Sequence, residues 1–456
     1  MTERAGPLLR RGLGLLDATT IVAGAVIGTG IFLVPSLVAR QVGAPGLSLA
    51  VWLVCGFLAL SGALCFAELG GAIPRTGGTY AFLYRAFRTP LLPFLFGWSM
   101  FFVVLTGVMA AVATAFAIYA GFFLEGVIPY GVWTRRLVAI GCILFLTAMN
   151  CIGVRVGGRI QVLFAIVKVG ALLVIIAVGF LLGDVGRAGG GGDLAPLLPS
   201  GRPAGDVVGA FGTAMIVALF AYNGWWYTTF VAGELRNPRR TIPRSIFFGM
   251  GIVLVLYVLA NIVYLAVLPF DALQASARPA ADTMARLLGP GGAALISAAV
   301  MLSAFGTVNA QMLSIPRIYF AMARDGLFFR RLARVHPRFR TPATAILAQG
   351  LWASGFALTG TYQEIITYTA FPNYFFLSLA VLGLIVLRVR EPDLPRPYRV
   401  WAYPLTPVLF LLIFAWYLVN SLLNAFADTM VGVLLTGFGI PFYFYWARNR
   451  DGGAGT

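Results

Sequence analysis

The chain has 456 residues, of which 60% are hydrophobic and 11% are charged, and its mean hydropathy is +0.89. Soluble domains carry about 25% charged residues, so this composition excludes an ordinary soluble protein and predicts an all-α polytopic membrane protein. A net charge of +17 would favour nucleic-acid binding in a soluble protein. Here the placement of the charges indicates membrane topology instead, and we expect no nucleic-acid partner.

Apolar segments long enough to cross about 30 Å of hydrocarbon recur along the whole chain. Loops between them are short, so we expect residues 1–456 to form a single membrane domain surrounded by lipid. The first segment is too long for a cleaved signal peptide and lacks a small-residue cleavage site. We predict twelve transmembrane helices, at about 13–39, 46–70, 92–120, 136–153, 159–182, 207–232, 245–268, 292–322, 343–359, 363–387, 404–424 and 428–447.

Arginines are unevenly divided between the two sides of the predicted membrane domain. With a cytoplasmic N-terminus, most of them fall in the inner loops, as the positive-inside rule requires. Both termini are therefore expected to be cytoplasmic. The basic residues left on the outer side are Arg40, Arg135, Arg136, Arg187, Arg202, Arg278 and Arg286.

Two segments contain helix-breaking residues halfway along their length. The first has three glycines within Gly24–Gly30, and the sixth has the turn dipeptide Asn223–Gly224 at the same depth. Broken backbone is tolerated in hydrocarbon only where it lines a cavity, although glycines in membrane helices also serve close packing. Matching breaks in helices 1 and 6 predict a five-plus-five inverted repeat, with residues 1–182 and 207–388 as the repeats and residues 404–447 as two added helices.

The paired breaks also predict the chemistry of a ligand. Free N–H groups at the start of a half-helix attract a carboxylate, and free carbonyl groups at the end of a half-helix attract an ammonium group. The predicted N–H donors are Gly28, Thr29 and Gly30, and the predicted carbonyls are those of Val26, Phe220, Ala221 and Asn223. A zwitterionic α-amino acid fits this pair. No acidic or basic residue occurs in the middle of segments one, three, six, eight and ten, so we expect a neutral substrate.

Four aromatic residues surround the second break. We expect Phe220, Tyr222, Trp225 and Trp226 to line or gate the cavity, although aromatics in apolar segments also pack or face lipid. Phe220 is the predicted gate. Trp226 is predicted to narrow the side-chain pocket.

Lys168 is the only lysine in the chain and lies about 14 Å along the fifth segment at 1.5 Å per residue. A charge at this depth is costly and indicates function, because a desolvated lysine can remain a compact cation or release its proton. The alternative is a lysine that snorkels to the interface.

Other reactive residues give no sign of a cofactor, a metal site or an enzyme. The four cysteines fall inside apolar segments without a CxxC spacing, and a single histidine makes no metal site. No polar groups suited to catalysis converge at the midplane. Glu68, near the end of the second segment, is expected at the interface.

Three motifs carry a resemblance that covers nearly the whole chain. They are GAVIGTGIF at Gly24–Phe32, FAYNGWWYTTFVAGELRNPRRTIP at Phe220–Pro243, and Ser303–Asn309 followed by Pro316–Gly326. The chain resembles the amino acid–polyamine–organocation transporters, and in particular their L-type amino acid transporter branch. The resemblance implies twelve helices in the five-plus-five fold, amino acid transport by alternating access and, often, obligatory exchange.

The resemblance also implies roles for individual residues. Lys168 matches a lysine that replaces a bound cation in many relatives and is expected to bridge Gly24–Val26 and Ser303, which makes sodium dependence unexpected. Trp226 stands where many members carry Asn, and Asn223 stands where Gly is common. The outer loop Gly121–Arg136 has no cysteine, so no disulfide-linked heavy chain is expected, and a bacterial inner-membrane protein is implied.

Other functions remain open at this stage. A Lys168 that stays charged favours amino acid exchange, whereas one that loses its proton in each cycle favours proton symport. A nutrient sensor that binds without transporting is a further alternative. Polyamines or cationic amino acids would need an acidic residue in the cavity, and the predicted site has none.

Overall fold

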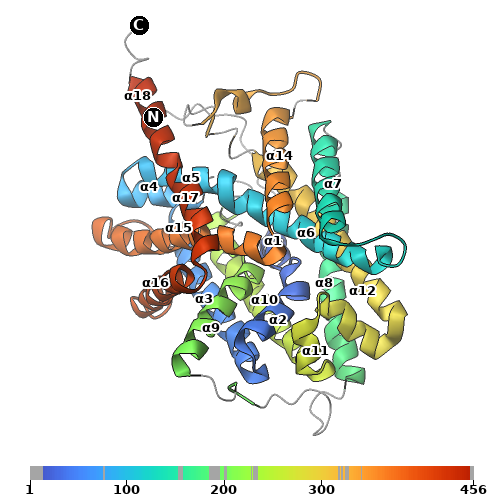
Figure 1. Cartoon of the computed structure of the whole chain (residues 1–456). Coiled ribbons are helices and arrows are strands. Elements are labelled where there is room, and N and C mark those ends of the chain that lie inside the picture. Colours follow the sequence, from blue (N-terminus) through green and yellow to red (C-terminus); the bar gives the residue numbers. More distant parts are fainter. Residues whose placement is uncertain are drawn as a thin grey trace.

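The structure is a computed structural model that describes residues 14–74, 78–152, 158–183, 196–199, 203–226, 229, 235–316, 319, 322–323, 328–339 and 341–451. Helices make up nearly all of this part of the chain (Figure 1). Within it, the one β pairing outside a strand is an isolated bridge between Glu125 and Ile128.

In chain order, the described helices extend from Leu15 to Asp451. The first half of the chain contains α1 (Leu15–Val26), α2 (Gly30–Val42), α3 (Pro45–Ala72), α4 (Thr79–Phe87), α5 (Leu91–Ser99), the π-helix η1 (Met100–Val104), α6 (Leu105–Leu124), α7 (Val132–Cys151), α8 (Gly158–Leu182) and α9 (Ala204–Ala221). The second half contains α10 (Pro238–Val267), α11 (Phe270–Ala275), α12 (Pro279–Ser314), the short 3-10 helix η3 (Arg330–Ala333), α14 (Ala343–Thr359), α15 (Tyr362–Arg390), α16 (Leu405–Asn424), α17 (Phe426–Gly437) and α18 (Gly439–Asp451).

Fewer helices meet the length and hydropathy criteria for a membrane span than the twelve that the sequence predicts. Among the described residues, 9 helices are long and apolar enough to cross a membrane, and the bent pair α1 and α2 makes up to 10. Two further predicted segments hold α14, with 17 residues, and the shorter apolar helix Ile166–Leu182 within α8. The all-α polytopic fold is therefore confirmed, while twelve spans stay a prediction.

Both predicted helix breaks are present. α1 ends at Val26, α2 begins at Gly30, and their axes differ in direction by 42°. α9 ends at Ala221, and Gly224 then adopts a φ of +111° that favours glycine. Most of the predicted sixth segment beyond Trp226 lies outside the described residues.

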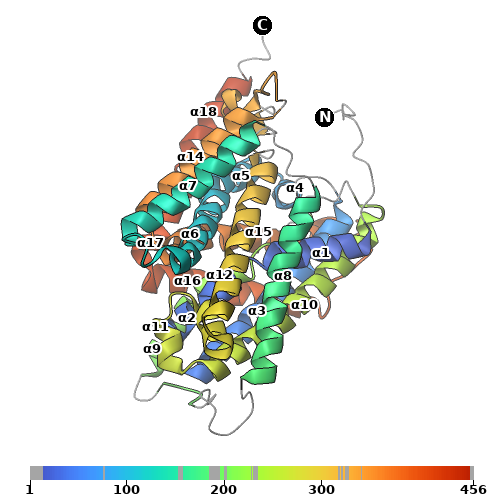
Figure 2. The same ribbon diagram turned by 90° about the vertical axis from the view of Figure 1, so that its right-hand side faces the viewer.

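The two broken segments lie in the middle of the molecule. α1 packs along α10, which also packs on α3, and α2 packs against α9 (Figures 1 and 2). α12 contacts both α6 and α8 and closes the other side of α2, as Figure 2 shows. Helices from distant parts of the sequence therefore surround the breaks.

A short helical arm covers the end of α2 that lies away from the break. The segment predicted as a lid or connector, residues 269–290, contains α11 and the start of α12, which kinks at Gly289 with a φ of 70°. Arg40 in the last turn of α2 donates from Nε and Nη2 to the Gln274 carbonyl at 3.1 and 2.9 Å. Gln274 Nε2 donates back to the Ala39 carbonyl at 3.1 Å. α11 is thus fastened to α2.

Glu68 is buried rather than interfacial, because α3 continues past it and α15 covers it. Its side chain is 0% exposed and accepts from Arg388 Nε at 2.9 Å and Nη2 at 2.6 Å. Arg396 Nε lies 3.4 Å from the same carboxylate, and the Val400 N–H donates to it at 2.7 Å. This ion pair joins α3 to α15 and to the connection that follows α15.

Replacing Arg388 with Ala should destabilise the protein by about 3 kcal/mol, because removing one partner strands a buried charge. Thermal unfolding of the detergent-purified protein measures the loss. Arg390→Ala is the matched control, since Arg390 is exposed and donates only to the Ala86 carbonyl. Equal melting temperatures for the two variants would contradict the assigned role of the pair.

Candidate functional site

A cavity of about 400 Å³ lies where the two broken segments meet. It is bounded by α1, the start of α2, α6, α8, the end of α9 and α12. Of the predicted site residues, all except Trp226 line it, namely Gly24, Val26, Gly28, Thr29, Gly30, Lys168, Phe220, Ala221, Asn223 and Ser303. Residues from distant parts of the sequence therefore meet in one chamber.

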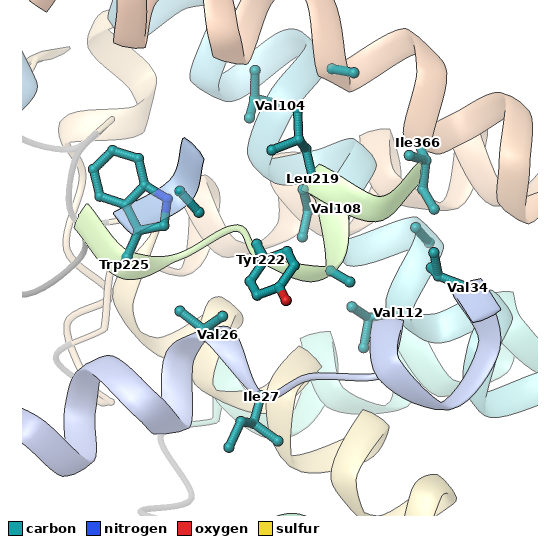
Figure 3. Packing of buried hydrophobic residues seen from close by; sticks show 14 of the residues in the cluster. Val26, Ile27, Val34, Val104, Val108, Val112, Leu219, Tyr222, Trp225 and Ile366 are labelled. Atoms are coloured by element: carbon teal, nitrogen blue, oxygen red, sulfur yellow. The ribbon is translucent and has the colours of Figure 1, made fainter. Parts of the chain in front are cut away.

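Two glycines let the interruptions approach each other closely. A Cβ atom on Gly30 would lie 2.7 Å from both Cα and Cβ of Ala221, and one on Gly224 would lie 2.9 Å from the Ala25 carbonyl oxygen. Figure 3 shows the result, with Val26 at the end of α1 pointing toward the segment that follows α9, where Tyr222 lies, and Ile27 pointing away from it. Backbone therefore packs on backbone, and the polar ends of both breaks are held at the cavity wall.

Tyr257 on α10 links the two breaks directly. Its hydroxyl lies 2.9 Å from the Val26 carbonyl oxygen and 3.1 Å from that of Ala221, and its side chain is 0% exposed. A helix end buried in an apolar environment needs such a donor for its free carbonyls. The sequence does not predict this contact, because nothing in an apolar segment indicates which carbonyl group a tyrosine hydroxyl will contact.

The start of α2 offers N–H groups to the cavity. Thr29 is its N-terminal cap, without a side-chain capping hydrogen bond, and Gly30 is its first residue. The first N–H groups of a helix have no partner within it and carry a partial positive charge. Since Gly28, Thr29 and Gly30 all line the cavity, this end is suited to an anionic group such as a carboxylate.

Lys168 reaches α1 from α8. Its Nζ donates to the Gly24 carbonyl oxygen, and it is the one formally charged residue among those that line the cavity. The amine therefore points into the break rather than along the helix to an interface. The expected second contact is not formed, because the buried Ser303 hydroxyl has no hydrogen-bond partner among the described residues.

The aromatic residues of the second break do not act as a group. Phe220 lines the cavity, whereas Tyr222, Trp225 and Trp226 are 0%, 2% and 0% exposed. Trp225 packs edge-on against Phe66 with ring centroids 5.0 Å apart. The prediction that all four line the cavity is wrong, because three of them fill the protein interior.

Trp226 contacts a residue that lines the cavity, Asn223, although it does not line the cavity itself. Its indole Nε1 donates to Asn223 Oδ1 at 3.1 Å. This bond holds the Asn223 side chain, and Asn223 is the residue of the two that lines the cavity.

Phe220 and Tyr362 separate this cavity from a second one. Their rings meet edge to face with centroids 6.1 Å apart. The first cavity runs from Phe220 towards Thr20 on α1 and Gln311 on α12, while Tyr362 lines a separate cavity of about 390 Å³ beside the end of α2. The ring pair therefore forms part of the wall between two chambers.

Gly30→Ala should force α2 and α9 apart and destabilise the protein by about 1–3 kcal/mol. Gly28→Ala is the matched control, because its Cβ would meet nothing closer than the Val26 oxygen at 3.8 Å. Melting temperature and elution profile in detergent measure both variants. If Gly30→Ala is as stable as Gly28→Ala, the close approach of the breaks is refuted.

Tyr257→Phe removes one hydroxyl and leaves two buried carbonyls without it, which should cost about 1–3 kcal/mol. Thermal unfolding provides the measurement. Tyr84→Phe is the control, because that side chain is 51% exposed. A melting temperature unchanged from the parent chain would show that the bridge between the breaks does not stabilise the fold.

Comparisons with known proteins agree with this architecture. A family model described as amino acid permease matches residues 13–442. The chain is 34% identical to the "Large neutral amino acids transporter small subunit 2" of Homo sapiens over 450 residues, which covers 97% of this chain and 82% of the relative.

Two further relatives have different names. The "Asc-type amino acid transporter 1" of Mus musculus is 34% identical over 439 residues, which covers 96% of this chain and 81% of the relative. The "Cystine/glutamate transporter" of Homo sapiens is 32% identical over 438 residues, covering 96% and 85%. The chain belongs to the amino acid permease family and is a multi-pass membrane protein that transports amino acids.

Proposed function

We propose that this protein carries neutral L-amino acids across the cell membrane by alternating access, without sodium and by exchange. The observation that supports this most directly is the pairing of helix N–H groups and helix carbonyls around one cavity. Of the residues that line it, only Lys168 is charged. A cationic substrate side chain would find no carboxylate there, and an anionic one would find only Lys168, which already donates to the Gly24 carbonyl. A neutral side chain needs no charged partner.

The substrate would lie across the two breaks. The N–H groups of Gly28, Thr29 and Gly30 would bind its carboxylate. The carbonyls of Val26, Phe220, Ala221 and Asn223 would bind its ammonium group. A carbonyl oxygen has two lone pairs, so Val26 and Ala221 can accept from Tyr257 and from the substrate together.

Lys168 would take the place of a bound cation. Its hydrogen bond to the Gly24 carbonyl places a positive charge at the negative end of α1, and a sodium ion at that place would be repelled. Proton symport is the second candidate, since a lysine without a nearby carboxylate can release its proton in a low-dielectric site.

The direction in which the substrate cavity opens follows from the proposed orientation. With cytoplasmic termini, the cavity extends towards the cytoplasm, and the Phe220–Tyr362 pair closes it from the outside. The inverted repeats would comprise residues 1–182 and 207–388, with residues 404–447 added. Because no cysteine occurs in Gly121–Arg136, we also propose that the chain functions without a disulfide-linked partner, in a bacterial inner membrane.

The test is uptake of labelled neutral amino acids into liposomes that contain only the purified chain. Uptake confined to vesicles preloaded with unlabelled amino acid supports exchange. Accumulation in empty vesicles that requires a pH gradient supports proton symport instead. Binding without uptake in either case would identify a sensor and refute transport by this chain.

Lys168→Ala should lower uptake at least about tenfold, because the carbonyl end of α1 loses its cation. A rise of about 1.4 kcal/mol in the rate-limiting barrier already gives this factor. Adding sodium should not change the parent rate. Cys151→Ala is a suitable control, since that half-buried side chain lies away from the residues that line the cavity. Parental uptake by Lys168→Ala would refute the role of the lysine.

A further inference from the structure

The second cavity is strongly basic. It has a volume of about 390 Å³ and lies between the end of α2, α6, the start of α7, the turn before α12 and the α14–α15 connection. Arg40, Arg135 and Arg136 all line it, and its other lining residues include no Asp or Glu. Three guanidinium groups from two helices far apart in the sequence therefore meet in one chamber.

Within the described part of the chain, none of the three arginines forms an ion pair with a carboxylate. Arg40 is bound by the neutral Gln274 carbonyl. Arg136 lies over the Trp133 ring at 5.0 Å. Arg135 Nε is buried and has no hydrogen-bond partner among the described residues. The charge of the cavity is therefore uncompensated.

A neighbouring arginine, by contrast, does form an ion pair with a carboxylate. Arg278 Nη2 lies 2.7 Å from Glu125 Oε2, so its charge is paired, and Arg278 does not line the cavity. The positive-inside rule disfavours arginines on the outer side. Three of the few arginines predicted there gather around one cavity, and none of them pairs with a carboxylate of the described residues, which indicates a binding role rather than topology.

Helix α2 connects this cavity to the substrate site. Its first residue, Gly30, lines the central cavity, and Arg40 in its last turn lines the basic one. At 1.5 Å per residue the two positions are about 15 Å apart along the helix. Between the chambers stand Phe220 and Tyr362, whose rings touch. A ligand released from the arginines would pass this pair to reach the N–H groups of α2.

We propose that the basic cavity is an outer docking site for carboxylates, which binds the α-carboxylate of the incoming amino acid before the substrate passes Phe220 and Tyr362. This inference rests on the proposed function and on the proposed orientation. A guanidinium group can bind a carboxylate through two parallel hydrogen bonds. Several unpaired charges in a walled cavity also focus the electric field and raise the association rate of an oppositely charged group.

The test compares uptake by intact cells that produce the parent protein or the double variant Arg135→Gln/Arg136→Gln. The apparent KM for external neutral amino acid should rise about tenfold, the lower end of the range for electrostatic focusing. The maximal rate should stay the same, and the rise of KM with salt should become weaker. In inverted vesicles, where the cytoplasmic face is outside, KM should not change.

Arg286→Gln is the matched control for the single variants, because it removes one positive charge from an exposed position on α12 outside the cavity. The single variants Arg135→Gln and Arg136→Gln, each expected to raise KM by a smaller factor, cover the case in which the double variant does not fold. An external KM that is unchanged, or that rises equally in the control, would overturn the proposal. A change seen only in inverted vesicles would do the same.

Lipid phosphate could bind the same guanidinium groups, and a change of vesicle composition separates the two ligands. In liposomes of phosphatidylcholine alone and in liposomes that also contain phosphatidylglycerol, the double variant should raise KM alike. An effect confined to the anionic lipid would assign the arginines to lipid and overturn the proposal. If the parent protein takes up no amino acid, the proposed function itself fails, whereas parental uptake with an unaltered KM in the variants refutes only the docking site.

Discussion

Backbone groups freed by a helix break must find partners inside the protein, because hydrocarbon offers none. The rest of this structure depends on how that requirement is met. At the central cavity the Tyr257 hydroxyl lies within hydrogen-bonding distance of the Val26 and Ala221 carbonyl oxygens. Lys168 donates to the carbonyl oxygen of Gly24. Tyr374 donates to the Leu219 carbonyl at 2.7 Å, two residues before the end of α9. The residues at the start of α2 line the same cavity.

The same requirement explains why the breaks touch. Gly30 against Ala221 and Gly224 against Ala25 remove the space that lipid or water would otherwise fill. Partial charges of opposite sign, from the start of one half-helix and the ends of two others, are thereby fixed a few ångströms apart. A zwitterion carries the complementary pair of charges. In the proposed binding mode the polar contacts to an amino acid come mainly from the backbone, and the apolar walls would set the substrate preference.

Phe220 and Tyr362 give the fold its division into two chambers. One chamber carries backbone dipoles and a single lysine, and the other carries three unpaired arginines. α2 spans the distance between them, tied to α11 through Arg40 and Gln274 at one end and to α9 through Gly30 at the other. α2 is therefore held at both ends beside the wall that the ring pair helps to form.

The sequence by itself determined the membrane class, the positions of both helix breaks and the presence of one deep lysine. Each of these is a local property: a run of apolar residues, a cluster of glycines, or a charge within an apolar segment. It also predicted ten of the residues that line the central cavity, because a break in hydrocarbon must face one, but not those that α6 and other parts of α1 and α12 contribute, such as Thr20, Val108 and Gln311.

Only the tertiary structure decided which side chains contact one another. Tyr257 and the ion pair between Glu68 and Arg388 depend on contacts between residues far apart in the chain, and no local pattern encodes such a contact. For the same reason the sequence could not show that Trp225 and Trp226 point into the protein interior while Phe220 faces the cavity. Side chains on one short segment have similar chemistry, and the helices that pack around the segment decide which of them remain exposed to a ligand.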